Sequence, residues 1–139
     1  MLSDITVEQI QSLLEQYQLD QGGHIIIEAL GERSARARFR VARKHLRPGD
    51  TVSGPTLMAL ADAALYAAVL GEIGLVPLAV TTNLTINFLK KPAQKDVVCD
   101  VKLLKVGKRL AVGEVYLYSE GDPELVAHVS ATYSIPPKR

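Results

Sequence analysis

The pattern of hydrophobic and polar residues predicts an amphipathic helix near the N-terminus. Thr6 and Gln9 have the spacing of a capping box, and hydrophobic residues recur after them at helical intervals. The pattern fades before Gly22 and Gly23, a pair that favours a change of chain direction. We therefore expect a helix over about residues 6–19.

Six further segments have the pattern of β-strands. In each of them β-branched and other hydrophobic residues alternate with polar residues or form a short apolar run, and turn-forming residues separate the segments. The expected strands are His24–Leu30, Arg33–Val41, Leu78–Leu89, Val97–Val106, Arg109–Tyr118 and Leu125–Ile135. The connectors between the last four strands are short, so these strands should be antiparallel neighbours.

A second helix is expected after a loop over Arg43–Gly54. Pro55 suits a first helical position, and Thr56–Leu70 is apolar on nearly every side before the glycine- and proline-containing break over Gly71–Pro77. A helix of this kind must be covered by other structure. The order of elements predicts an α+β fold in which an antiparallel sheet covers this helix, and the hotdog fold is one such architecture.

Composition narrows the class of protein. The chain has 139 residues, which suits one domain over residues 1–139, and its net charge of +1 gives no broad attraction to nucleic acid. The lone Cys99 excludes a disulfide within the chain, and the first residues lack the pattern of a secretory signal, so we expect a cytoplasmic protein. Asp62 and Glu72 interrupt the longest apolar stretch, so no membrane span is expected.

Asp62 is the one charged residue of the apolar segment Thr56–Leu70. Burying a carboxylate without partners costs several kcal/mol, so something must compensate this charge. One interpretation is structural, with Asp62 fixing the packing through hydrogen bonds to the backbone or to a neighbouring subunit. The other is functional, with Asp62 as a catalytic carboxylate.

The start of the same helix is a candidate anion site. Gly54 would let a carbonyl group approach closely, and its N–H can donate to an oxyanion at the positive end of the helix. Pro55 has no N–H, so Thr56 is the other early donor. An ordinary Gly-Pro helix start explains the same residues without any function.

The spacing of Gly54 and Asp62 links these features to an oligomer. Eight positions separate them, which corresponds to about 12 Å along a helix axis. One carbonyl group cannot easily meet both residues of one chain. If both act on the same substrate, they come from different protomers related by a two-fold axis, and we expect a homodimer or a homotetramer built as a dimer of dimers.

The sequence resembles the hotdog-fold acyl-CoA thioesterases of the phenylacetate-degradation type, within the wider 4-hydroxybenzoyl-CoA thioesterase superfamily. The resemblance covers roughly Ala29 to Ile135. It rests on the turn Ser53-Gly54-Pro55, the helix segment Leu60-Ala61-Asp62, the strand Thr81–Leu89 with Pro92 after it, and the hairpin Leu104–Arg109.

The resemblance implies acyl-CoA hydrolysis with Asp62 as nucleophile or general base, Gly54 as oxyanion donor, and Thr81, or the adjacent Thr82, as a hydroxyl that positions water or substrate. It implies no cofactor beyond the coenzyme A of the substrate, whose phosphates would meet cationic pairs at strand ends. The residues expected to contact substrate are Ser53, Pro55, Thr56, Thr82, Asn83, Lys90, Lys91, Lys108 and Arg109.

Two positions depart from the family pattern. Ser53-Gly54-Pro55 stands where the family commonly has His-Gly-Gly, and Arg47 stands near a usual asparagine. A non-hydrolytic acyl-CoA-binding protein is therefore the alternative, and a purely structural oligomer is the third class. The three histidines lack metal-ligand spacing, so no metal site is expected.

Overall fold

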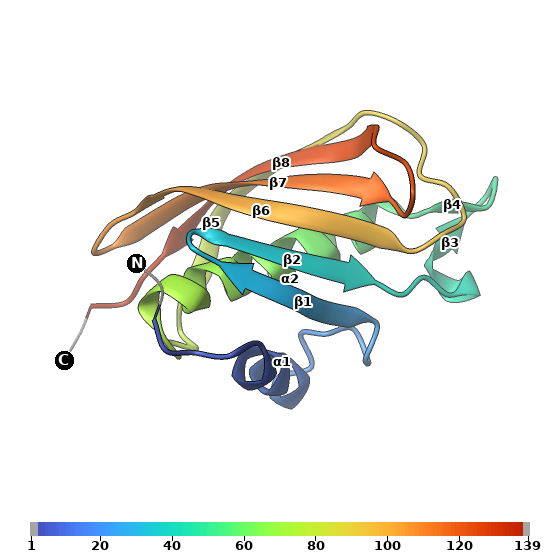
Figure 1. The fold of residues 1–139 in the computed structure, drawn as a ribbon. Coiled ribbons are helices and arrows are strands. Elements are labelled where there is room, and N and C mark those ends of the chain that lie inside the picture. Colours follow the sequence, from blue (N-terminus) through green and yellow to red (C-terminus); the bar gives the residue numbers. More distant parts are fainter. Residues whose placement is uncertain (1–2, 138–139) are drawn as a thin grey trace.

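The computed structural model describes residues 3–137 and contains two α-helices, a short 3-10 helix and eight strands (Figure 1). The helices are α1 (Val7–Gln16), η1 (Arg43–His45) and α2 (Gly54–Ile73). The strands are β1 (Ile25–Gly31), β2 (Ser34–Phe39), β3 (Leu46–Arg47), β4 (Thr51–Val52), β5 (Val80–Phe88), β6 (Val97–Val106), β7 (Leu110–Ser119) and β8 (Leu125–Ser134).

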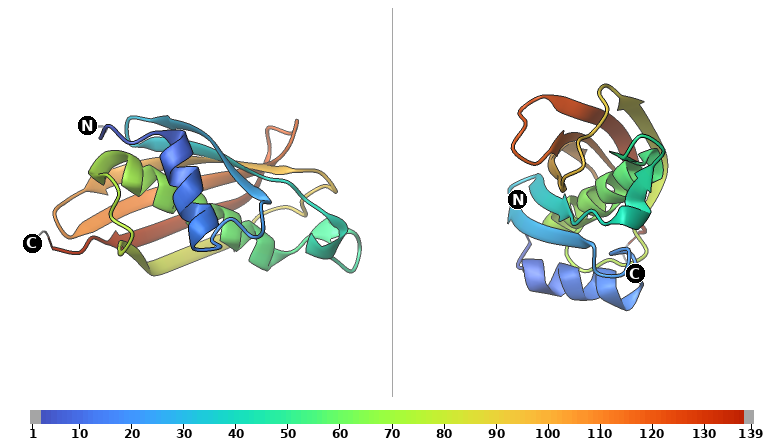
Figure 2. Two further views of the ribbon diagram at one scale, coloured as in Figure 1. Left: turned by 90° about the horizontal axis from the view of Figure 1, so that it is seen from below. Right: turned by 90° about the vertical axis from the view of Figure 1, so that its right-hand side faces the viewer.

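Six strands form one antiparallel sheet in the order β1-β2-β6-β7-β8-β5, and β3 and β4 form a separate small hairpin. The large sheet curls around α2, as the end-on view in Figure 2 shows, and α1 packs beside β1. The crossover that carries α2 between β4 and β5 places β5 at the far edge of the sheet. The expected α+β architecture with a wrapped central helix, the hotdog fold, is confirmed.

The helix α2 is buried because the sheet covers most of its surface. By length and composition it is apolar enough to span a membrane, but 72% of its most apolar stretch is buried inside the protein, as expected of a core helix. Gly113 on β7 allows close packing, because a Cβ there would lie 2.9 Å from a methyl carbon of Leu65 on α2. The alanines along α2 serve the same close approach to the sheet.

The two edges of the sheet differ. At β1, the side chain of Gln11 on α1 donates to the carbonyl of Ile25 at 3.0 Å and accepts from the N–H of Ile27 at 2.8 Å, which satisfies outward-facing backbone groups. At β5, by contrast, no strand pairs with the outer side in the described part of the chain. Val80 and Phe88, near the two ends of β5, are more than half exposed. The edge of β5 is therefore open and partly apolar.

The strands lie within two residues of their expected bounds, whereas the two helices and the loop between β2 and α2 differ more from the sequence-based expectation. The first helix is shorter than expected and ends at Gln16, with the Thr6 capping box present. The second helix does not break at Gly71, which is buried within it, and continues to Ile73. Gly74, with a φ of 90° that glycine adopts at little cost, ends it. The expected loop over Arg43–Gly54 contains η1, β3 and β4.

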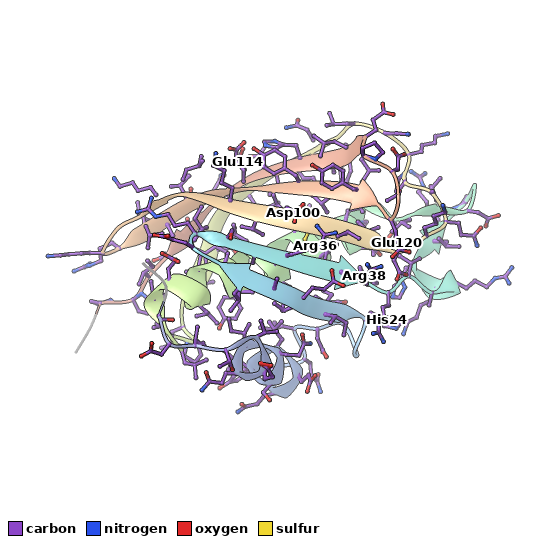
Figure 3. All side chains as sticks on the ribbon, in the orientation of Figure 1. His24, Arg36, Arg38, Asp100, Glu114 and Glu120 are labelled. Carbon is purple, nitrogen blue, oxygen red and sulfur yellow. The ribbon has the colours of Figure 1, made fainter. Side chains whose placement is uncertain are left out.

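The arginines that alternate along β2 lie on the outer face of the sheet, where Figure 3 labels Arg36 and Arg38. Arg36 pairs with Asp100 at 3.0 Å, and Arg38 bonds to Glu28, Asp96 and Glu120. These carboxylates, Glu28 and Glu120 first, raise the pKa of Arg38 further above its ordinary value. These arginines and carboxylates form an ion-pair network on the solvent-facing side of the sheet.

Candidate active site

Asp62 projects from the middle of α2 toward the open edge of the sheet, and its side chain is half-buried. Thr81 on β5 donates its hydroxyl to Oδ1 of Asp62 at 2.6 Å. The hydroxyl of Tyr133 on β8 lies 3.1 Å from the same oxygen and 3.2 Å from the backbone carbonyl of Asp62. The carboxylate is therefore compensated by two hydroxyl donors rather than by a cation.

The two donors reach Asp62 because Thr81 and Tyr133 are directly opposite each other in the β5–β8 pairing. Opposed residues share one face of a sheet, which here is the face toward α2. Tyr133 is 3% exposed, and burial, followed by the charge of Asp62, raises the pKa of its phenol far above the ordinary value. Tyr133 therefore remains a protonated donor at physiological pH.

A cavity of about 230 Å³ opens beside Asp62. Its walls are mostly apolar, and its polar groups come chiefly from Asp62, Thr81 and the connector between α1 and β1. The lining residues are Leu19, Gln21, Ala59, Asp62, Ala63, Tyr66, Pro77, Ala79, Val80, Thr81 and Tyr133. The carboxylate thus stands at an apolar enclosure, where a reactive acyl group can be shielded from water.

The start of α2 presents one unused backbone donor. Ser53 caps the helix: its Oγ accepts from the Thr56 N–H at 3.3 Å and lies 2.7 Å from the Thr56 hydroxyl. The Leu57 N–H bonds to the Ser53 carbonyl at 3.2 Å. Within residues 3–137 the Gly54 N–H meets no acceptor. Thr56 is therefore occupied in capping, and Gly54 is the donor available to an oxyanion.

The Gly54 turn borders a second cavity, of about 430 Å³, distinct from the cavity at Asp62. Phe88, at the end of β5, covers Gly54 so closely that a Cβ on the glycine would lie 3.2 Å from its ring. Arg47, Lys90 and Lys91 also line this cavity. In one chain, Gly54 and Asp62 therefore belong to two separate cavities.

The cationic pairs lie at opposite ends of the sheet. Lys90 follows β5 next to the start of β8, where its N–H bonds to the Val126 carbonyl, and its ammonium pairs with Asp122 and Glu124. Arg109 lies at the other end of β8, where its carbonyl accepts from Ile135. Ten residues of β8 separate these ends, a distance of about 30 Å.

Three further residues expected at the site, Thr82, Asn83 and Pro55, line neither cavity. Thr82 sits at a bulge in β5, where its hydroxyl bonds outward to the Thr132 carbonyl at 3.2 Å. Asn83 is exposed on the open strand, and Pro55 is exposed on the first turn of α2. Sequence reasoning missed Tyr133 and Phe88, since nothing in the local pattern of their strands ties them to Asp62 or Gly54.

Two histidines pack behind the Gly54 turn. The rings of His24 and His45 lie 4.4 Å apart between centroids, and the His45 carbonyl accepts the N–H of Ser53 at 2.9 Å. Burial, then the charges of His24 and Lys44, lower the pKa of His45 below its ordinary 6.5.

His128 lies elsewhere, on the outer sheet face, paired with Glu114 at 2.7 Å. No group of three metal-ligating side chains occurs within residues 3–137.

Comparison with known proteins identifies the family. The model of the Thioesterase superfamily matches residues 49–126, more than half of the chain. A solved structure from Silicibacter sp. TM1040, provisionally assigned as a thioesterase, is 42% identical, with a TM-score of 0.88 over 99% of this chain and 95% of that protein.

Two more distant proteins are also similar to this chain. A protein of Saccharolobus solfataricus, provisionally assigned as an esterase, is 28% identical over 94% of this chain and 86% of its own length. The E. coli PaaI protein from the phenylacetic acid degradation operon shares the fold, with 22% identity and a TM-score of 0.75 over 91% of this chain and 95% of that protein. The chain therefore belongs to the thioesterase superfamily and is a thioester hydrolase of the hotdog fold.

Proposed function

We propose that the protein hydrolyses acyl-CoA thioesters to a free acid and coenzyme A, with Asp62 as the catalytic carboxylate. The observation that carries this proposal is the setting of Asp62, whose Oδ1 is held by two hydroxyls beside an apolar cavity. An acyl group needs an apolar enclosure, and its carbonyl needs a base or nucleophile beside it.

Asp62 acts on the thioester carbonyl in one of two ways. As a general base it takes a proton from water, the water oxygen bonds to the acyl carbon, the C–S bond breaks, and the thiolate takes the proton back. As a nucleophile it bonds to the acyl carbon itself and displaces the thiolate, and water then hydrolyses the anhydride. In both cases the Gly54 N–H stabilises the charge on the carbonyl oxygen. Single-turnover hydrolysis in heavy-oxygen water separates the two routes, because only a nucleophilic Asp62 can become labelled.

We propose that each active site is shared between two protomers. The separate cavities of Gly54 and Asp62 support this arrangement, because one chain does not offer both groups to one carbonyl. The open, partly apolar edge of β5 is the proposed contact with a second copy. A two-fold axis would set the two α2 helices antiparallel. If Gly54 of one helix faces Asp62 of the other, the axis passes beside residue 58, which lies midway between positions 54 and 62. Met58 is the exposed large hydrophobic residue of α2 (41% exposed), as a contact at the axis requires.

The same two-fold axis would bring the cationic pairs together. Lys90 and Lys91 of one protomer would approach Lys108 and Arg109 of its partner, because the axis places opposite ends of the two sheets side by side. Such a cluster suits the phosphates of coenzyme A. We propose a homodimer, or a homotetramer built from two such dimers, that needs no cofactor. The single buried Cys99 favours the cytoplasm as its compartment.

A non-hydrolytic acyl-CoA binder is the second candidate. The start of α2 supports it, since Pro55 lacks an N–H and the Thr56 N–H is used by the cap, which leaves a single oxyanion donor. Arg47, which lines the Gly54 cavity, offers a positive charge for binding an anionic ligand but neither a general base nor a nucleophile.

A panel of acyl-CoA esters, monitored by thiol release and by ligand-induced thermal stabilisation, separates the two candidates. The proposed function predicts steady release of coenzyme A with at least one ester. Thermal stabilisation by esters without thiol release would support the binder. Neither response to any ester would contradict both.

A further inference from the structure

The two oxygens of Asp62 have different surroundings. Thr81 and Tyr133 both direct their hydroxyls to Oδ1, and no residue within 3–137 donates to Oδ2. No buried side-chain nitrogen or oxygen in this range lacks a hydrogen-bond partner. Oδ2 is therefore accessible to solvent, and the cavity beside Asp62 gives it that access.

The geometry of the sheet explains why one oxygen receives both bonds. Thr81 and Tyr133 are opposed on β5 and β8, so their hydroxyls approach Asp62 from neighbouring points of one surface. The terminal torsion of an aspartate is soft, and one donor alone restrains it weakly. Two donors on Oδ1, with Tyr133 also within reach of the Asp62 carbonyl, fix the orientation of the carboxylate.

Tyr133 is itself held rigidly. Its ring is buried and stacks on Tyr66, with 6.0 Å between ring centroids and an interplanar angle of 27°. The Tyr66 hydroxyl in turn bonds to the Pro77 carbonyl at 2.9 Å. The Tyr133 hydroxyl donates to Oδ1 and lies within reach of the backbone carbonyl of Asp62, and it also interacts with the Thr81 hydroxyl that holds the same oxygen. The contacts of this hydroxyl therefore centre on Asp62 and on its other hydroxyl partner.

We propose that Tyr133 is a positioning residue that, together with Thr81, holds Oδ1 of Asp62 and leaves Oδ2 as the oxygen that acts on the substrate. This inference rests on the proposed function of Asp62. In the general-base route, the proton of water moves to Oδ2, the water oxygen bonds to the acyl carbon as the C–S bond breaks, and Oδ2 returns the proton to the thiolate. In the nucleophilic route, Oδ2 forms the bond to the acyl carbon as the C–S bond breaks and the thiolate leaves, and water then hydrolyses the resulting anhydride.

Tyr133→Phe tests the inference, because it keeps the stacked ring and removes only the hydroxyl. We expect kcat to fall about tenfold, the effect of losing a hydrogen bond to a charged group, and KM to change less than about twofold. Thr81→Val should act in the same direction, and the double variant should lose more than the product of the two single effects. Tyr118→Phe, which removes a hydroxyl on the outer sheet face, is the matched control and should keep parental kcat.

The same substitution in an Asp62→Asn background shows whether Tyr133 acts through Asp62. If it does, Tyr133→Phe should leave the residual activity of Asp62→Asn unchanged. An inactive Asp62→Asn with parental kcat in Tyr133→Phe would overturn this inference alone. An equal loss from Tyr133→Phe in both backgrounds would also overturn it, because the hydroxyl would then act independently of the carboxylate. Parental activity in Asp62→Asn would instead overturn the proposed function.

Discussion

Replacing Asp62 by asparagine should separate activity from stability. The amide oxygen can keep both hydroxyl partners of Oδ1, and the new NH2 group replaces Oδ2, which reaches the cavity. Hydrogen bonds to a neutral acceptor are weaker than those to a charged one by about 1 kcal/mol each, so the two together cost about 2 kcal/mol. The neutral amide also avoids the desolvation penalty of a half-buried charge, and this offsets part of the lost stability. The free energy of unfolding should therefore change by no more than about 2 kcal/mol.

The rate should respond far more strongly. Loss of a general base lowers kcat by about 10²- to 10⁴-fold, and loss of a nucleophile by at least as much. The assay is thiol release with the best ester of the panel, beside thermal unfolding of the same preparation. An Asp62→Asn protein that stays folded and keeps parental turnover would refute the catalytic assignment. A protein that fails to fold would show that Asp62 is a structural residue.

Three further predictions concern other parts of the molecule. Because the pKa of half-buried His45 is lowered from 6.5, the unfolded chain binds more protons below about pH 6.5, and the free energy of unfolding should fall as the pH falls. Denaturant titrations should show a smaller fall in His45→Gln, and an equal fall would count against this linkage. Lys108→Ala with Arg109→Ala should raise KM for full coenzyme A esters, with little change in kcat and little change in KM for esters that lack the nucleotide. An equal effect on both kinds of ester would show that the pair does not contact the nucleotide. Met58→Lys should place like charges at the proposed axis and shift sedimentation toward monomers, whereas an unchanged oligomer would place the axis elsewhere.

The strand pattern and the turns were sufficient to predict the sheet, because alternation and turn chemistry are local properties of the chain. Val97–Val106 coincides with β6. The end of α2 was harder to predict, since Gly71 lies inside the helix while Gly74, with a positive φ, ends it. No local pattern distinguishes a helical glycine from a terminating one three residues later.

The candidate site was only partly predictable. Asp62 stands out because a charge in an apolar helix is costly, and the family resemblance indicated Thr81, which the structure brings to it at 2.6 Å. Tyr133 could not be found in this way, because its contact with Asp62 depends on the pairing of β5 with β8, strands that are distant in sequence. The position of Phe88 over Gly54 depends likewise on how β5 crosses α2.

The shared active site is the central claim, and a mixed oligomer tests it most directly. Asp62→Asn and Gly54→Pro, which removes the unused N–H, are each expected to be inactive alone. When they are unfolded together, refolded at equal concentration and assayed for thiol release, half of the dimers are mixed, and each mixed dimer has one intact site. Activity should therefore return to about one quarter of the parental value. If the mixture stays as inactive as its parts although mixed dimers form, Asp62 and Gly54 do not act from different protomers.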